Sequence, residues 1–212
     1  PPDRDPGSAG SAAHQSDVVA AVRARLAQGA TGAAGDDARG GGGGRPGAAY
    51  GVLARRDRCH RARSSRGSGD SGARNAGAGI NIIGNYIFGL PEDDLDSMQE
   101  TLDLAIELKT EFANFYSAMA YPGSPLYRQA IANGWPLPET WSGYSQHAVD
   151  TLPLPTRHLP ASEVLKFRDH AFRKYFADKS YLEYVERRFG ADTVAHIREM
   201  SSHQLERKFA AA

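Results

Sequence analysis

The chain has 212 residues, 25 basic and 25 acidic side chains, and a single cysteine, Cys59. One cysteine cannot form an internal disulfide, which excludes a secreted disulfide scaffold. The sequence has no run of eighteen apolar residues and no signal-peptide pattern, which excludes a transmembrane helix and leads us to expect a cytoplasmic protein. Because it begins with Pro1 and not Met, we expect it to be part of a longer protein.

The amino-acid composition changes in one step near residue 79. Residues 1–79 contain no Lys, Glu, Ile, Phe, Trp or Met, and 17 Gly, 18 Ala and 12 Arg fill 47 of the 79 positions. Such a segment cannot bury a core, so we expect residues 1–78 to be low in complexity and disordered. These residue types are typical of GC-rich codons, and we hypothesise that residues 1 to about 77 are translated out of frame. A genuine disordered tail is the alternative.

The formal charge is split between the two parts of the chain. Residues 1–79 carry 12 Arg against 7 Asp, which gives +5, and residues 80–212 carry −5. Arg scattered among Gly and Ala without any Lys is weak evidence for nucleic-acid binding, so we expect no nucleic-acid partner. The glycine run 40–44 lacks the preceding strand and the following Lys-Ser/Thr of a phosphate-binding loop, which favours low complexity.

Residues 80–134 predict the order strand–helix–strand–helix, and hence an α/β fold with a right-handed parallel unit. Residues 80–89 form a nearly continuous apolar run, which is typical of a strand covered on both faces. The predicted bounds are a strand over 80–89, a helix from a cap at Asp93 or Asp94 to about Lys109, a strand over 112–120, and a short helix to Asn133.

Residues 135–212 predict an aromatic and proline-rich connector followed by a helical extension. Five prolines between positions 135 and 160 indicate an extended segment over a surface. Three helices are expected: about 162–178, about 180–189, and one from Thr193 after a cap at Asp192. We expect the aromatic residues of this tail to form a small apolar cluster of their own: Tyr175, Phe176, Tyr181, Tyr184 and Phe189.

Residues 85–92, with the sequence NYIFGLPE, resemble the fifth-strand signature G-x-I-x-G-x-x-E of the radical S-adenosylmethionine enzymes. Ile87, Gly89 and Glu92 match the pattern, whereas Asn85 replaces its first glycine. The longer string IFGLPEDDLDSMQETLDLAIEL and the strand end YPGSPLY are most similar to members with an upstream cobalamin-binding domain. The resemblance covers residues 79–134 well and the helical tail more loosely.

The resemblance implies that residues 79–134 are the C-terminal strand–helix units of a partial TIM-like barrel, with residues 135–212 as an α-helical extension. In such a barrel the ligand lies over the C-terminal ends of the strands. Gly89 would let a flat ring approach the backbone, and Glu92 would anchor the turn. The implied contacts of the adenine side of S-adenosylmethionine are Asn85, Ile87, Gly89, Glu92, Tyr121, Pro122 and Gly123.

The implied chemistry is reductive cleavage of S-adenosylmethionine to a 5′-deoxyadenosyl radical, with cobalamin-linked methyl transfer as a further form. The substrate would be a small or lipid-like molecule. The family holds a [4Fe–4S] cluster with three cysteines of a C-x-x-x-C-x-x-C loop, and Cys59 alone cannot hold one. We therefore expect this chain alone to be inactive.

Two further groups of residues could carry chemistry. His147 and Asp150 lie in the connector and are candidates for lining a substrate pocket. His196, Glu199 and His203 share one helical face, but an exposed polar stripe explains them better than a metal site does. Acidic residues in the first turn after Pro91 are explained by the helix dipole.

Two alternatives remain open at this stage. The chain could be a non-catalytic α/β module that binds a nucleoside or a partner helix without cluster chemistry. It could also be a fragment that does not fold alone, because two strands of a barrel leave unpaired edges.

Overall fold

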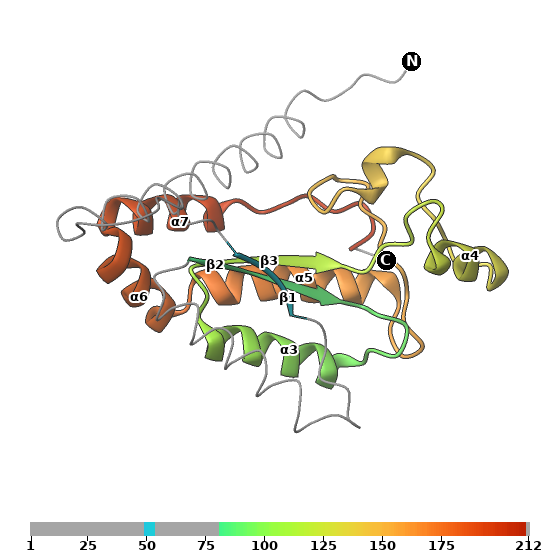
Figure 1. The fold of residues 1–212 in the computed structure, drawn as a ribbon. Coiled ribbons are helices and arrows are strands. Elements are labelled where there is room, and N and C mark those ends of the chain that lie inside the picture. Colours follow the sequence, from blue (N-terminus) through green and yellow to red (C-terminus); the bar gives the residue numbers. More distant parts are fainter. Residues whose placement is uncertain (1–48, 54–80, 211–212) are drawn as a thin grey trace, which may run out of the picture.

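The computed structural model describes residues 49–53, by their backbone alone, and residues 81–210 (Figure 1). Most of residues 1–78, where disorder is expected, lies outside the described residues. The elements are β1 (Ala49–Leu53), β2 (Ile82–Phe88), α3 (Leu95–Leu108), β3 (Phe112–Ser117), α4 (Pro125–Ala132), the 3-10 helix η1 (Trp141–Tyr144), α5 (Ala161–Phe176), α6 (Lys179–Phe189) and α7 (Ala191–Ser202).

The described strands form one parallel sheet in the order β1-β2-β3, which confirms the α/β class. The unit β2–α3–β3 was expected from the sequence. Strand β1 was not, and it corrects the expectation of disorder for residues 49–53. This pentapeptide contains Tyr and Val, which favour strands, and it finds a parallel partner in β2.

Strands β2 and β3 place aromatic rings on the face covered by helices. Tyr86 lies opposite Phe115 in the register, with ring centroids 5.4 Å apart, and Phe88 stacks on Phe115 at 5.9 Å. Since side chains alternate between the two faces of a strand, Asn85 and Ile87 lie on the other face of β2.

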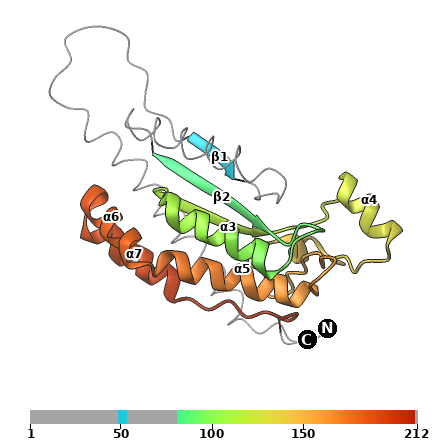
Figure 2. The same cartoon turned by 90° about the horizontal axis from the view of Figure 1, so that it is seen from below.

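Helices α3 and α5 pack side by side on the aromatic face of the sheet (Figure 2). The shared core contains Tyr86, Phe88, Met98, Leu102, Phe115, Val185, Ile197 and Met200, with Phe172, Tyr175, Phe176 and Tyr181. The aromatic residues of the helical tail therefore do not form a cluster of their own. They belong to the main core, because α5 brings them against the strands.

The helix boundaries follow local capping. Asp94 caps α3, as expected, and accepts a hydrogen bond from the Ser97 N–H at 2.8 Å. The expected cap at Asp192 is wrong, because α7 already begins at Ala191 after Gly190, which has φ +86°. Asp192 lies inside the first turn, where a carboxylate favours the helix dipole.

Side chains close the outer edge of β3. The Ala118 N–H donates to the Phe88 carbonyl on the β2 side, so the backbone groups of Ser117 and Phe115 point away from β2. The Ser117 N–H donates to Gln146 Oε1 at 2.9 Å, and Gln146 Nε2 donates to the Ser117 carbonyl at 3.1 Å. Arg168 Nε donates to the Phe115 carbonyl at 2.8 Å. An amide and a guanidinium thus occupy the place of a further strand.

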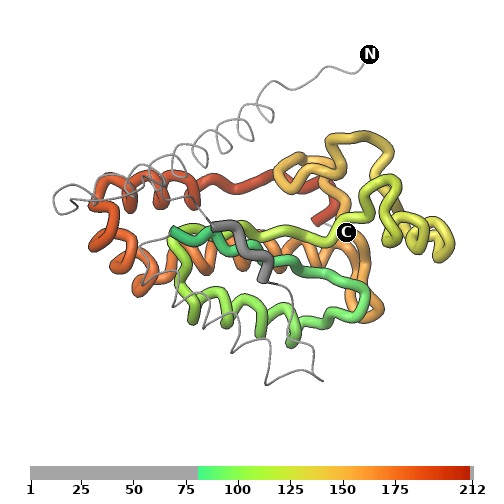
Figure 3. Tube along the Cα trace, viewed as in Figure 1, coloured from blue at the N-terminus to red at the C-terminus, as the bar shows by residue number. Residues whose placement is uncertain are grey.

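The C-terminal segment after α7 runs back toward residues 140–150 (Figure 3) and is fixed by Arg207. Its side chain is only 4% exposed and binds both carboxylate oxygens of Asp169 at 2.8 Å. The same guanidinium donates to the carbonyls of Gln146 and Ala148 and to the Thr151 hydroxyl. The Arg207 side chain therefore links the C-terminal segment to α5 and to residues 146–151.

Replacing Arg207 with Gln tests this cluster through its pH dependence. Burial alone would raise the pKa of Asp169, but Arg207 and Arg168 outweigh burial and hold that pKa below its usual value. A carboxylate with a lowered folded-state pKa stabilises the fold fully above its unfolded pKa of about 3.9, and this contribution is lost as the pH falls through the folded value. We expect Arg207→Gln to be less stable near pH 7, with a difference that narrows below about pH 4.

Denaturant unfolding at several pH values, followed by circular dichroism, measures this difference. The neighbouring substitution Lys208→Gln removes the same charge from an exposed side chain and is the matched control. A loss of stability in Arg207→Gln that stays constant from pH 7 to pH 3 would contradict the expectation.

Candidate functional site

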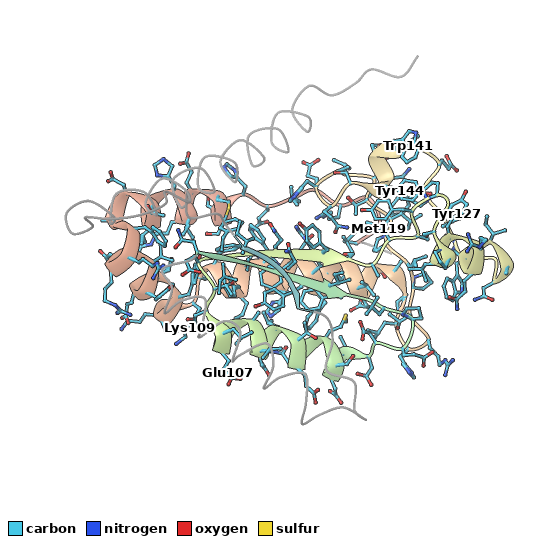
Figure 4. All side chains as sticks on the ribbon, in the orientation of Figure 1. Glu107, Lys109, Met119, Tyr127, Trp141 and Tyr144 are labelled. Carbon is cyan, nitrogen blue, oxygen red and sulfur yellow. The ribbon has the colours of Figure 1, made fainter. Side chains whose placement is uncertain are left out.

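The carboxyl ends of the parallel strands β2 and β3 lie at the same end of the sheet, and the loops that follow them form the candidate site. In parallel α/β folds ligands bind at the carboxyl ends of the strands. The two loops are residues 89–94 after β2 and residues 118–124 after β3. Figure 4 shows Met119, Tyr127, Trp141 and Tyr144 gathered at this end of the molecule.

Gly89 at the end of β2 is required by the packing of α5. Its φ is +81°, and a Cβ there would lie 2.3 Å from Val164 Cγ1. The sequence suggested that the missing side chain lets a flat ring approach. The structure gives the glycine another reason, because the space of its side chain is taken by a valine of α5.

The turn after β2 is anchored by Asp93. Its carboxylate is buried, accepts a hydrogen bond from the Leu90 N–H at 2.8 Å, and accepts another from the Ser97 hydroxyl at 3.2 Å. Glu92, expected as the anchor, is exposed and pairs with Arg157 at 3.0 Å. Sequence reasoning assigned Asp93 only to helix capping and to the helix dipole. Asp93 stands three residues after Leu90, and this spacing is the feature of the sequence from which such a turn could have been predicted.

Asn85 and Ile87 share the sheet face away from α3 and α5 with two residues of β3. Asn85 lies opposite Asn114, and Asn114 Nδ2 donates to Asn85 Oδ1 at 2.8 Å. Ile87 lies opposite Tyr116, and all four residues are half-buried. Asn114 and Tyr116 were not singled out from the sequence. No alternating polar pattern in FANFYS marks them, and their place opposite Asn85 and Ile87 follows only from the strand register.

The loop after β3 carries Tyr121, whose ring contacts Tyr144 of η1, and Tyr144 in turn contacts Trp141. The ring centroids of Tyr121 and Tyr144 are 5.7 Å apart, and those of Tyr144 and Trp141 are 5.8 Å apart. Trp141 is 76% exposed, whereas Tyr144 is buried. Burial raises the pKa of Tyr144, and the nearby Tyr127 adds to the shift, so the Tyr144 hydroxyl stays neutral at physiological pH.

The other two residues of this loop were expected to face the adenine. Pro122 and Gly123 are exposed, and Gly123 has φ +86° with no heavy atom within 4 Å of an added Cβ. The Gly123 carbonyl accepts a hydrogen bond from Arg128. The turn therefore connects β3 to α4, and its residues Pro122 and Gly123 are exposed to solvent.

His147 and Asp150 lie in the segment between η1 and α5. Asp150 Oδ2 accepts hydrogen bonds from Ser142 Oγ at 2.5 Å and Thr140 Oγ1 at 3.1 Å, so the carboxylate lies beside η1. The His147 N–H donates to Ser145 Oγ. Asp150 is therefore placed next to the aromatic residues, which the sequence alone did not reveal.

Within residues 81–210 no group of three His, Cys, Asp or Glu side chains is arranged to hold a metal ion. His196 Nδ1 lies 2.7 Å from the Asp192 carbonyl of its own helix. The described part of the chain also has no helix long and apolar enough to cross a membrane.

Part of the chain is similar to a known protein. A Pyrococcus horikoshii protein described as an uncharacterized methyltransferase is 26% identical over 98 residues, which are 46% of this chain and 21% of that protein. The chain thus spans about a fifth of the length of this relative. No protein-family profile matches the chain.

Replacing Gly89 with Ala tests the contact with α5. We expect a loss of about 2–4 kcal/mol in unfolding free energy, from overpacking against Val164 and from the positive φ. Gly134→Ala is the control, because Gly134 has φ +64° and no heavy atom within 4 Å of an added Cβ, so only about 1 kcal/mol of backbone strain is expected. A double variant with Val164→Ala should recover part of the loss, and equal costs at the two glycines would refute the packing argument.

Comparing Asp93→Ala with Glu92→Gln identifies the anchor of the turn. Removing the buried carboxylate leaves the Leu90 N–H unpaired, which should cost about 1–3 kcal/mol. Breaking the exposed pair of Glu92 with Arg157 should cost less than about 1 kcal/mol. Thermal and denaturant unfolding measure both values, and the reverse order would restore Glu92 as the anchor.

Proposed function

We propose that residues 79–134 form the C-terminal strand–helix units of a radical S-adenosylmethionine barrel, followed by residues 135–212 as a helical extension, and contribute the adenine-side wall of the cofactor site. The observation that carries the proposal is the half-buried sheet face of Asn85 and Ile87, at the strand end where the family's signature is found. The parallel order of the strands and the loops at their carboxyl ends support it.

The residues present fit the nucleoside part of S-adenosylmethionine. Ile87 and Tyr116 offer an apolar wall on which an adenine ring can lie. The hydrogen bond between Asn114 and Asn85 fixes the orientation of two amides beside that wall. Tyr121 would border the ring from the loop after β3. When bound, S-adenosylmethionine supplies the methyl or adenosyl group for the reaction of the parent enzyme. These residues would bind and orient the cofactor.

The residues present do not fit a [4Fe–4S] cluster. Residues 81–210 contain no cysteine, and Cys59 lies outside the described residues. The proposal therefore includes no step through a cluster. Cluster ligands and cobalamin would belong to other parts of a longer enzyme.

The likeness to a protein described as a methyltransferase supports a methyl-donor cofactor. Because this chain spans only a fifth of that protein, the activity, the cobalamin and the small or lipid-like substrate of a whole enzyme remain part of the proposal.

A second candidate is a non-catalytic binding module that holds a nucleoside without radical chemistry. Such a module requires no cluster ligands, and residues 81–210 contain no cysteine. Iron and sulfide stoichiometry after anaerobic reconstitution separates the two candidates. In the longer enzyme that the proposal requires, about four irons per molecule would support the radical enzyme, and no iron would support the module. This chain alone lacks the cluster cysteines and is expected to bind no cluster under either candidate.

Equilibrium dialysis of the full chain with S-adenosylmethionine tests the proposal. We expect Ile87→Ala to weaken binding about fivefold, because about 1 kcal/mol of apolar contact with the ring is lost. Ile83→Ala is the matched control, because Ile83 lies on the same face at the amino end of β2 and is more deeply buried. It should lower stability without lowering affinity. Absence of saturable binding, or equal losses of affinity in both variants, would overturn the proposal.

A further inference from the structure

Three aromatic side chains form a continuous surface beside the candidate cofactor site. We define this aromatic platform as Tyr121, Tyr144 and Trp141, whose rings contact one another in that order at 5.7 and 5.8 Å. Trp141 is 76% exposed and Tyr121 is 50% exposed. The two exposed rings do not contact each other directly, because the buried Tyr144 lies between them. Exposed aromatic side chains gathered in one place are a feature of binding surfaces.

The backbone that carries the platform is closely packed and hydrogen-bonded. The Leu152 N–H donates to the Gly143 carbonyl at 3.0 Å, which fixes η1 to the segment before α5. A Cβ on Gly143 would lie 2.6 Å from Pro138 Cβ, so the turn is closely packed. Tyr144 itself is buried and supports both neighbouring rings. A rigid set of rings loses little conformational entropy when a ligand binds.

The charges around the platform favour a positive ligand. Asp150 lies beside η1 through its hydrogen bonds with Ser142 and Thr140. Residues 118–150 contain two carboxylates, Asp150 and Glu139, and one guanidinium, Arg128, which donates to the Gly123 carbonyl. From the C-terminal segment, Arg207 donates to the Gln146 and Ala148 carbonyls, but its charge is paired with Asp169, and the Lys208 ammonium lies over the Phe209 ring. The negative faces of aromatic rings and a carboxylate both attract cations.

We propose that the aromatic platform binds a planar organic cation, as the substrate side of the site whose cofactor side includes Ile87. The inference rests on the proposed function, because Tyr121 lies at the border of the two surfaces. The ring of the ligand would lie on Trp141 and Tyr121, and its positive charge would be oriented toward Asp150. An anion of the same size would bind less tightly.

Three benzyl compounds that differ in charge test the platform: benzyltrimethylammonium, benzyl alcohol and benzoate. The full chain with Trp135→Phe retains Trp141 as its single tryptophan, so its fluorescence reports binding at the platform. We expect a saturable change with the cation and an affinity about tenfold higher than for benzoate. No saturable change, or equal affinity for cation and anion, would overturn the proposal.

Variants of the otherwise unsubstituted chain, measured by calorimetry, locate the site. Trp141→Leu should weaken benzyltrimethylammonium binding at least about fivefold, and Asp150→Asn should reduce the preference over benzoate. Ile131→Ala, an exposed apolar residue of α4 outside the platform, should change neither. Equal weakening in Ile131→Ala would overturn the proposal.

The affinity of the unsubstituted chain for S-adenosylmethionine is measured alongside. If that cofactor does not bind but the aromatic cation does, the proposed function fails and the platform stands. If the cofactor binds and the cation does not, the platform fails and the proposed function stands.

Discussion

The bidentate ion pair between Arg207 and Asp169 is the interaction on which the rest of this structure depends. The Arg207 side chain is 4% exposed and that of Asp169 is 14% exposed, so the pair is largely shielded from water and its geometry is fixed by charge-assisted hydrogen bonds. Through the Gln146 carbonyl it holds the residue whose amide pairs with Ser117 at the edge of β3. An open strand edge invites pairing with other chains, and this cluster closes it with side chains that are supplied from outside the sheet.

The end of the sheet where the candidate site lies is shaped by α5 as well. Val164 fills the space beside Gly89, and Arg168, one turn along the helix, closes the β3 edge. Both strand ends are thus positioned by a helix about fifty to eighty residues later in the chain. The loops after β2 and β3 begin at these strand ends, whose positions are fixed by α5. The half-buried face of Ile87 and the aromatic platform are therefore supported by packed elements. Binding residues on a rigid base need little reorganisation.

Much of the local structure could be predicted from the sequence. The apolar run of β2, the cap at Asp94 and the helix after it appear as expected, because each depends on neighbours within a few residues. Strand β1, the 3-10 turn η1 and the start of α7 were missed. The first needs β2 as a partner, and the second needs Pro138 and Leu152 packed against Gly143. The candidate site was only partly foreseen, because Asp93, Asn114 and Tyr116 become relevant only through the turn and the strand register.

The sequence by itself determined the α/β class, the order of the elements over residues 80–134 and the strand end at which a ligand is expected. Apolar periodicity, caps and glycine positions are local signals, and local signals suffice for these conclusions. Only the tertiary structure decided that the aromatic tail joins the main core, that Arg207 links the C-terminal segment to Asp169 and Gln146, and that Tyr144 lies between the rings of Tyr121 and Trp141. These contacts join residues far apart in the chain, and their energies exist only once the intervening segments are packed.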